Sequence, residues 1–132
     1  MIRALDISGS ALAAQRTRLD VIAGNIANAE VTRRADGAPL PYRRRIVTFA
    51  SGAPAGGPGV HVAGVAQDPS PFREKYDPGH PDADALGYVQ LPNVSVTMEY
   101  VDALAAGRAY EANAAMLGVT RGMVQQALRL LG

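Results

Sequence analysis

Apolar residues near the N-terminus recur at every seventh position and are separated mostly by polar or small residues. The series comprises Leu5, Leu12, Leu19 and Ile26. A repeat of this length is typical of a helix that packs along one side against a partner. The pattern therefore predicts an N-terminal helical segment over residues 1–31.

A longer apolar series begins near residue 98, and its members follow one another by three or four positions. They are Met98, Val101, Ala105, Ala109, Ala112, Met116, Val119, Met123, Ala127 and Leu130. The mean spacing is about 3.6 residues, the period of an α-helix. Ser95 or Thr97 is suited to cap its N-terminus. The series predicts a C-terminal helical segment over residues 94–132.

A second apolar stripe widens the surface of this helix toward its end. It consists of Leu117, Val124, Leu128 and Leu131. A helix that is apolar on most sides is normally buried on most sides. One partner helix covers one side only, so the surplus favours contacts with further copies of the chain. The alternative is an ordinary core helix packed on the N-terminal one.

The segment between the helices, residues 32–93, is rich in turns and contains four β-prone pieces. These pieces span residues 45–49, 59–66, 72–76 and 88–91. The Gly/Pro connector 51–59 has the composition of a hairpin loop or surface insertion. The predicted fold is mainly α with a small β-rich insertion. Its paired N- and C-terminal helices form a coiled-coil-like hairpin, with the β and turn module between them.

Composition excludes several classes of function. The chain has no cysteine, a formal net charge of +1 and only 5% aromatic residues. Thiolate chemistry is therefore excluded, and a dedicated nucleic-acid binder would be more basic. Two histidines without a G-x-S-x-G elbow argue against a hydrolase. No apolar run reaches the roughly 20 residues of a membrane span. We expect neither enzymatic activity nor a cofactor.

The stretch YDPGHPDAD, residues 76–84, gathers carboxylates and an imidazole in a way that resembles a metal site. The run from Asp82 matches a calcium loop at three positions but lacks the ligands at the fifth and twelfth. A small calcium- or ligand-binding module using Asp82 and Asp84 is thus the alternative from a different class. We favour a rigid turn, in which two prolines fix the backbone and Gly79 permits a positive φ. The polar residues Asp77, His80, Asp82 and Asp84 then stabilise the turn or contact a neighbouring subunit.

The arginine cluster Arg43–Arg45 enters a predicted strand, so consecutive side chains point to opposite faces. A continuous track for phosphates is therefore disfavoured. We expect a charged strand edge, or pairing with carboxylates such as Asp77, Asp82 or Asp84 of another copy.

Several motifs together resemble the FlgC family of flagellar basal-body rod proteins. In chain order they are ALDISGSALAAQRTRLDVIAGNIANAEVT, PYRRR, DPSPFREKYDPGHPDAD, GYVQLPNVSV and AGRAYEANAAML. The resemblance implies a structural subunit of the proximal rod, the periplasmic drive shaft that transmits torque and encloses the export channel. It implies helical stacking through the terminal helices and export by the flagellar type III apparatus without a cleaved signal. A different rod subunit of the same family is the alternative.

The partners that the resemblance implies are the chain itself, the other proximal and distal rod subunits, the rod-to-ring adaptor and the export apparatus. Nucleic acid and direct membrane insertion are not expected. Asn25 and Asn28 match the family's GNIANA motif, and Arg108 to Asn113 match RAYEAN, in which Arg108 and Glu111 lie one helical turn apart. The expected subunit interface comprises Leu5, Leu12, Leu19, Asn25, Ile26, Asn28, Arg108, Tyr110, Glu111, Asn113, Met116, Val119, Met123 and Leu128.

Overall fold

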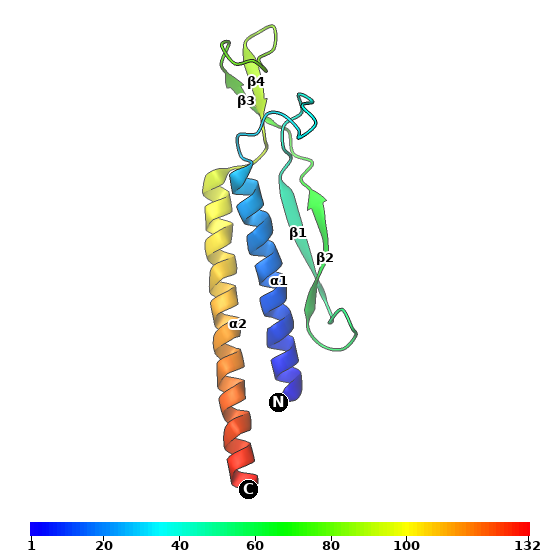
Figure 1. Cartoon of the computed structure of the whole chain (residues 1–132), viewed down its shortest axis with the longest axis vertical. Coiled ribbons are helices and arrows are strands. Elements are labelled where there is room, and N and C mark those ends of the chain that lie inside the picture. Colours follow the sequence, from blue (N-terminus) through cyan, green and yellow to red (C-terminus); the bar gives the residue numbers. More distant parts are fainter. The chain divides into compact units, whose positions relative to one another are not determined.

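Along the chain, one helix precedes four short strands and a second helix follows them (Figure 1). The computed structural model describes all residues 1–132. The elements are α1 (Ile2–Ala27), β1 (Arg45–Ser51), β2 (Val60–Gln67), β3 (Arg73–Tyr76), β4 (Tyr88–Leu91) and α2 (Val96–Leu131). The prediction of two terminal helices around a small β-rich insertion is confirmed, and each predicted strand is present. Neither helix carries a stretch long and apolar enough to cross a membrane.

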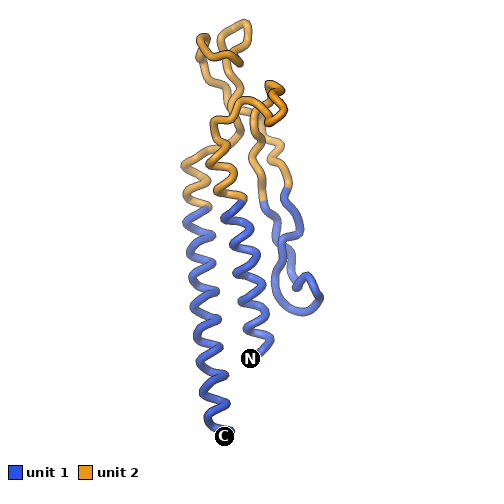
Figure 2. Tube along the Cα trace, in the orientation of Figure 1, with its two compact units in different colours: residues 1–20, 47–65, 103–132 blue, residues 21–46, 66–102 orange.

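The chain divides into two compact units, each of which takes a part of both helices (Figure 2). Unit 1 contains Met1–Asp20, Val47–Val65 and Ala103–Gly132, and unit 2 contains Val21–Ile46 and Ala66–Asp102. Each unit therefore combines parts of the three predicted segments 1–31, 32–93 and 94–132. The assembly role that we assign to each segment stays a prediction.

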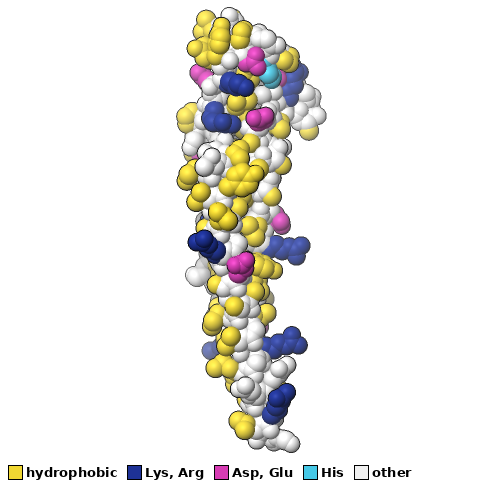
Figure 3. All heavy atoms as spheres, turned by 90° about the vertical axis from the view of Figure 1, so that its left-hand side faces the viewer, with side chains coloured by type: hydrophobic (Ala, Val, Ile, Leu, Met, Phe, Trp, Pro, Cys, Tyr) yellow, Lys and Arg dark blue, Asp and Glu magenta, His cyan; other side chains and the backbone are white.

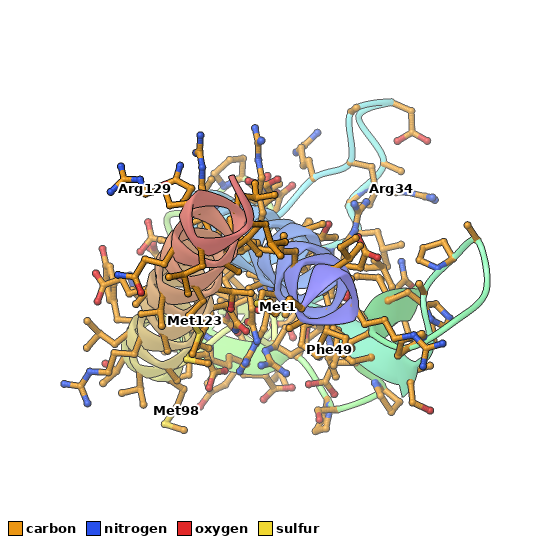
Figure 4. All side chains as sticks on the ribbon, turned by 90° about the horizontal axis from the view of Figure 1, so that it is seen from below. Met1, Arg34, Phe49, Met98, Met123 and Arg129 are labelled. Carbon is orange, nitrogen blue, oxygen red and sulfur yellow. The ribbon has the colours of Figure 1, made fainter.

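Unit 1 has a thin core made of small side chains. Its buried residues are Ala14 on α1 and Ala106 and Thr120 on α2. The segments of the two helices in this unit lie side by side (Figures 1 and 4). Small side chains let helix backbones approach closely, but they bury little apolar surface. Unit 1 therefore draws limited stability from its own core.

The β1–β2 hairpin is fastened to α1 within unit 1 at one close approach. The backbone N–H of Val60 donates to Ser10 Oγ at 3.1 Å. Gly59 has a φ of +144°, and a Cβ at this position would lie 2.6 Å from Ser10 Oγ. Glycine is favoured here, because a larger residue would be strained at this φ and its Cβ would displace the Ser10 hydroxyl that holds the loop. Residues 51–59 connect β1 to β2, and a backbone hydrogen bond from Gly52 N to Gly59 O closes this loop.

Unit 2 is built on the antiparallel pair of β3 and β4, with Arg73 opposite Leu91 and Tyr76 opposite Tyr88. Its apolar core contains Ile22, Ala29, Val89 and Val94. Ser95 precedes α2 as the N-cap, because its carbonyl and hydroxyl accept hydrogen bonds from the first-turn amides of Glu99 and Met98.

The glycine with a positive φ in the turn between β3 and β4 is not the one that the sequence analysis predicted. Gly79 does not have a positive φ; Gly87, at the end of the turn, does, with a φ of +84°. A Cβ on Gly87 would lie 2.9 Å from the ring of Tyr76. The glycine that the turn requires is therefore the one that closes it against β3.

Candidate assembly interface

The outer side of α2 in unit 1 carries a row of large apolar side chains that nothing in the chain covers. We call this row, Met116, Val119, Met123 and Leu130, the α2 stripe. The first three side chains are each 57% exposed and Leu130 is 88% exposed. Figure 3, which faces the α2 side of the molecule, shows hydrophobic side chains along this helix. In Figure 4, Met123 and Arg129 project from different sides of α2. The helix thus presents a distinct apolar side.

The apolar series from Met98 to Leu130 therefore lies mostly on the exposed side of α2. The sequence pattern did not identify the residues on the inward side. The inward residues also recur at every seventh position, but they are small or polar. They are Glu99, Ala106, Asn113, Thr120 and Ala127, all of them buried or half-buried. A search for small residues with a seven-residue period would have found this side, because close helix packing selects for size as well as for polarity.

The start of α1 and the end of α2 form an apolar groove in unit 1 with a volume of about 550 Å³. Its lining comprises Met1, Ile2, Arg3, Val124, Ala127, Leu128 and Leu131. Leu128 and Leu131 are largely exposed there. The expected interface residues Met116, Val119, Met123 and Leu128 are thus accessible, as an interface requires. The seam residues Leu5, Leu12, Leu19 and Ile26 are half-buried within the chain instead.

The RAYEAN motif lies on α2, and its residues point in different directions. Arg108, Tyr110 and Glu111 are exposed. Although Arg108 and Glu111 lie one helical turn apart, they form no ion pair within the chain, whose ion pairs involve Arg33 and Arg44. The Asn113 side chain donates to the carbonyl of Ala109, one turn earlier, at 2.8 Å.

Asn25 is a structural residue of unit 2 and not a surface residue. Its side chain is 1% exposed. Its Nδ2 donates to the Arg45 carbonyl at 2.9 Å and to Glu99 Oε2 at 3.2 Å, while its Oδ1 accepts from Tyr42 Oη and Arg45 N. The amide nitrogen and oxygen of Asn25 thus each have two partners within the chain, and its place in a subunit interface stays a prediction. Asn28 donates to the Gly24 carbonyl and ends α1, which is a capping role.

Arg44 joins the same buried cluster through three carboxylates. Its guanidinium lies 2.5 Å from Glu99, 3.2 Å from Asp68 and 3.5 Å from Asp102. The hydrogen bond to Glu99 raises the pKa of Arg44, and burial raises the pKa of the neighbouring Tyr42. Three carboxylates of its own chain thus surround Arg44, and the pairing of the Arg43–Arg45 cluster with another copy stays a prediction.

The acidic turn is also satisfied largely within the chain. Asp82 pairs with Arg33 at 2.6 Å and accepts from the Thr32 hydroxyl at 2.8 Å. These hydrogen bonds, led by that from Arg33, lower the pKa of Asp82. His80 accepts from the backbone of Asp82, and Asp84 Oδ1 accepts the backbone N–H groups at the end of the turn.

The carboxylate of Asp77 has no hydrogen-bond partner within the chain. The four polar residues of the turn thus differ in role, and no group of three acidic or histidine side chains converges as a metal site would require. The calcium-binding alternative is not favoured, since Asp82 and Asp84 are engaged in holding the turn.

Two family models match the ends of the chain. The model described as "Flagella basal body rod protein" matches residues 5–34, and that described as "Flagellar basal body rod FlgEFG protein C-terminal" matches residues 85–130. The matched ranges contain most of α1 and most of α2.

The chain is also similar over nearly its whole length to proteins named "Flagellar basal-body rod protein FlgC". It is 44% identical to the protein of Yersinia enterocolitica, over 98% of this chain and 97% of the relative. It is 43% identical to that of Salmonella typhimurium over the same shares. It is 41% identical to that of Bacillus subtilis, over 96% of this chain and 95% of the relative.

Proposed function

The chain belongs to the FlgC family of flagellar basal-body rod proteins, and on that premise we propose that it polymerises helically through α1 and α2 to build the proximal rod. It is a structural subunit of the flagellar basal body and not an enzyme. The exposed α2 stripe is the single observation that supports the assembly mode best.

The stripe offers a large free energy of association. Burying one Met, Val or Leu side chain fully stabilises a complex by about 1.5–3 kcal/mol. More than half of each stripe side chain is still exposed in the single chain, so most of that free energy remains available to contacts with neighbours. A soluble monomer would rarely keep such a row uncovered.

Burial of one side of each helix supports a coiled-coil-like pairing of α1 with α2. The seven-residue series on α1, from Leu5 to Ile26, and the small-residue series on α2, from Ala106 to Ala127, are both at least partly buried. In the proposed rod, the segments 1–31 and 94–132 are the assembly helices that surround the export channel, and the segment 32–93 lies on the outer surface. The turn residues Asp77, His80, Asp82 and Asp84 belong to this outer module.

The proposed location is the periplasmic rod of the basal body, which the subunit would reach through the flagellar type III export apparatus without a cleaved signal peptide. The proposed partners are further copies of the chain, the other proximal and distal rod subunits and the rod-to-ring adaptor. The support is the printed name of the relatives, rod proteins of the flagellar basal body.

Charged substitutions on two sides of α2 test the assembly mode. Met123→Asp places a carboxylate in the stripe, whereas Gln125→Asp places one on another side of the same helix, two residues away, at a position that is also exposed. We expect Met123→Asp to abolish rods and motility while the purified chain keeps its helical circular dichroism, and Gln125→Asp to preserve both. Rods of normal yield from Met123→Asp would refute the assembly mode.

A further inference from the structure

A cavity of about 510 Å³ lies in unit 2, and its wall is strongly basic. Four arginines line it, Arg33, Arg34, Arg43 and Arg45, and no acidic residue does. Its apolar wall includes Val31, Leu40 and Phe72. We call this hollow the arginine cavity.

Most of the positive charge of the arginine cavity is not neutralised by the chain. Only Arg33 has a carboxylate partner, Asp82. Arg43 donates to the carbonyls of Asp68 and Ser70, and its guanidinium lies 4.3 Å from the centre of the Phe72 ring. The side chains of Arg34 and Arg45 make no hydrogen bond or ion pair, and both residues are exposed. A guanidinium binds a carboxylate with two parallel hydrogen bonds, so the cavity is suited to an acidic ligand with an apolar part.

The tip of the β3–β4 hairpin has the complementary chemistry. Leu86, 77% exposed, and the rings of Tyr76 and Tyr88 form its apolar part; the rings contact edge to face with centroids 5.3 Å apart. The carboxylates of Glu74 and Asp77 have no hydrogen-bond or ion-pair partner in the chain. Lys75 lies between these two residues, but with Asp82 and Asp84 the stretch from Glu74 to Tyr88 has four carboxylates and one ammonium group, so the tip is an acidic and apolar knob whose chemistry matches the cavity.

The knob is also rigid before it binds anything. Its backbone is closed by hydrogen bonds from Asp77 N to Gly87 O and from Asp84 N to Tyr88 O, at 2.8 and 2.9 Å. The Asp84 carboxylate holds two further amides in place. A preorganised knob loses little conformational entropy on docking, so its contacts contribute more fully to affinity.

We propose that the β3–β4 tip of one subunit docks in the arginine cavity of the next copy of the chain. The inference rests on the proposed function, in that it requires the chain to assemble with itself. Within one chain the Arg33–Asp82 ion pair joins the turn to the cavity wall, but the knob and the cavity consist of different residues, so the contact between copies is head-to-tail. A repeated head-to-tail contact that does not close into a ring generates an open helical array, which is the form of a rod.

Engineered cysteines test the contact directly, because the chain has no cysteine of its own. Leu40→Cys in the cavity and Leu86→Cys on the tip are introduced in two co-expressed copies, and isolated basal bodies are oxidised. A crosslinked dimer containing one of each is expected. The matched control pairs Leu86→Cys with Ala55→Cys in the β1–β2 loop. Crosslinking no stronger than in this control would overturn the proposal.

Charge reversal supplies a second measurement that does not depend on cysteine geometry. Arg45→Glu should lower the yield of rods at least about tenfold, since like charges facing each other at an interface cost several kcal/mol. Asp77→Arg in the same chain should restore the yield. Lys75→Glu makes the same change of charge on the knob but adds to its attraction for the arginines, so it should not lower the yield; a loss as large as that of Arg45→Glu would overturn the proposal.

The two proposals fail in distinguishable ways. If Arg45→Glu assembles normally while Met123→Asp does not, the docking contact is wrong and assembly through α2 stands. If Met123→Asp assembles normally while the Leu40–Leu86 crosslink forms, the copies associate through the cavity and the role of the α2 stripe is wrong.

Discussion

Replacing Arg44 by methionine tests whether the buried polar cluster stabilises unit 2. Methionine keeps much of the side-chain volume but removes the charge that faces Glu99, Asp68 and Asp102. The Glu99 side chain is 1% exposed, so it cannot recover its interaction by turning to water. Removing one partner of a buried ion pair costs about 3–5 kcal/mol. The Arg44 side chain is itself 25% exposed, which places the expected loss near 3 kcal/mol.

Such a loss is a large fraction of the free energy of unfolding of a typical domain, about 5–15 kcal/mol. The chain has no tryptophan, so urea unfolding is best followed by the helical circular dichroism signal. The matched control is Arg45→Met, because Arg45 is the exposed neighbour whose side chain has no partner; it should change stability by less than about 0.5 kcal/mol. The double variant Arg44→Met/Glu99→Met should recover much of the loss, because the fully buried carboxylate is removed with its partner and the remaining Asp68 and Asp102 are partly exposed to water. If Arg44→Met costs no more than Arg45→Met, the cluster does not stabilise the fold as argued.

Two further predictions concern the turn and the response to acid. Gly87→Ala should destabilise the chain by about 1–3 kcal/mol, because Gly87 has a positive φ and a Cβ there would meet the Tyr76 ring. The control Gly79→Ala should be nearly neutral, since Gly79 has no positive φ. Equal melting temperatures of the two variants would refute this difference. The pKa of Asp68 is lowered mainly by hydrogen bonds from the Ser70 hydroxyl and N–H. The ionised form therefore stabilises the fold above the ordinary pKa of 3.8, and this stability is lost as the pH falls through the lower folded pKa. Thermal melts should show a smaller acid-induced loss for Asp68→Asn than for the parent, and equal losses would contradict the assignment.

Local sequence signals were sufficient to predict the secondary structure. The four strands lie between glycine- and proline-rich turns, and the last helix begins at a capping serine, so their positions depend on neighbours in the sequence. The polar cluster could not be found in this way, because Arg44 and Glu99 are 55 positions apart and no spacing pattern links them.

The sequence pattern also could not predict which side of α2 packs against the rest of the chain. In a self-contained protein the large apolar residues of a helix face its own core. In this chain Met116 and Met123 are exposed, while Ala106 and Thr120 are buried. A pattern of apolar residues shows that a helix has a side to bury, but it does not show whether the chain itself or a neighbouring copy covers that side.

The central claim is that the α2 stripe is buried between subunits of the rod. An electron cryomicroscopy map of the isolated basal body, at a resolution that places side chains, tests it most directly. We expect Met116, Val119, Met123 and Leu130 to contact other subunits and to be shielded from solvent. A rod in which these four side chains face water, and in which subunits contact one another only through the β-hairpins, would contradict it.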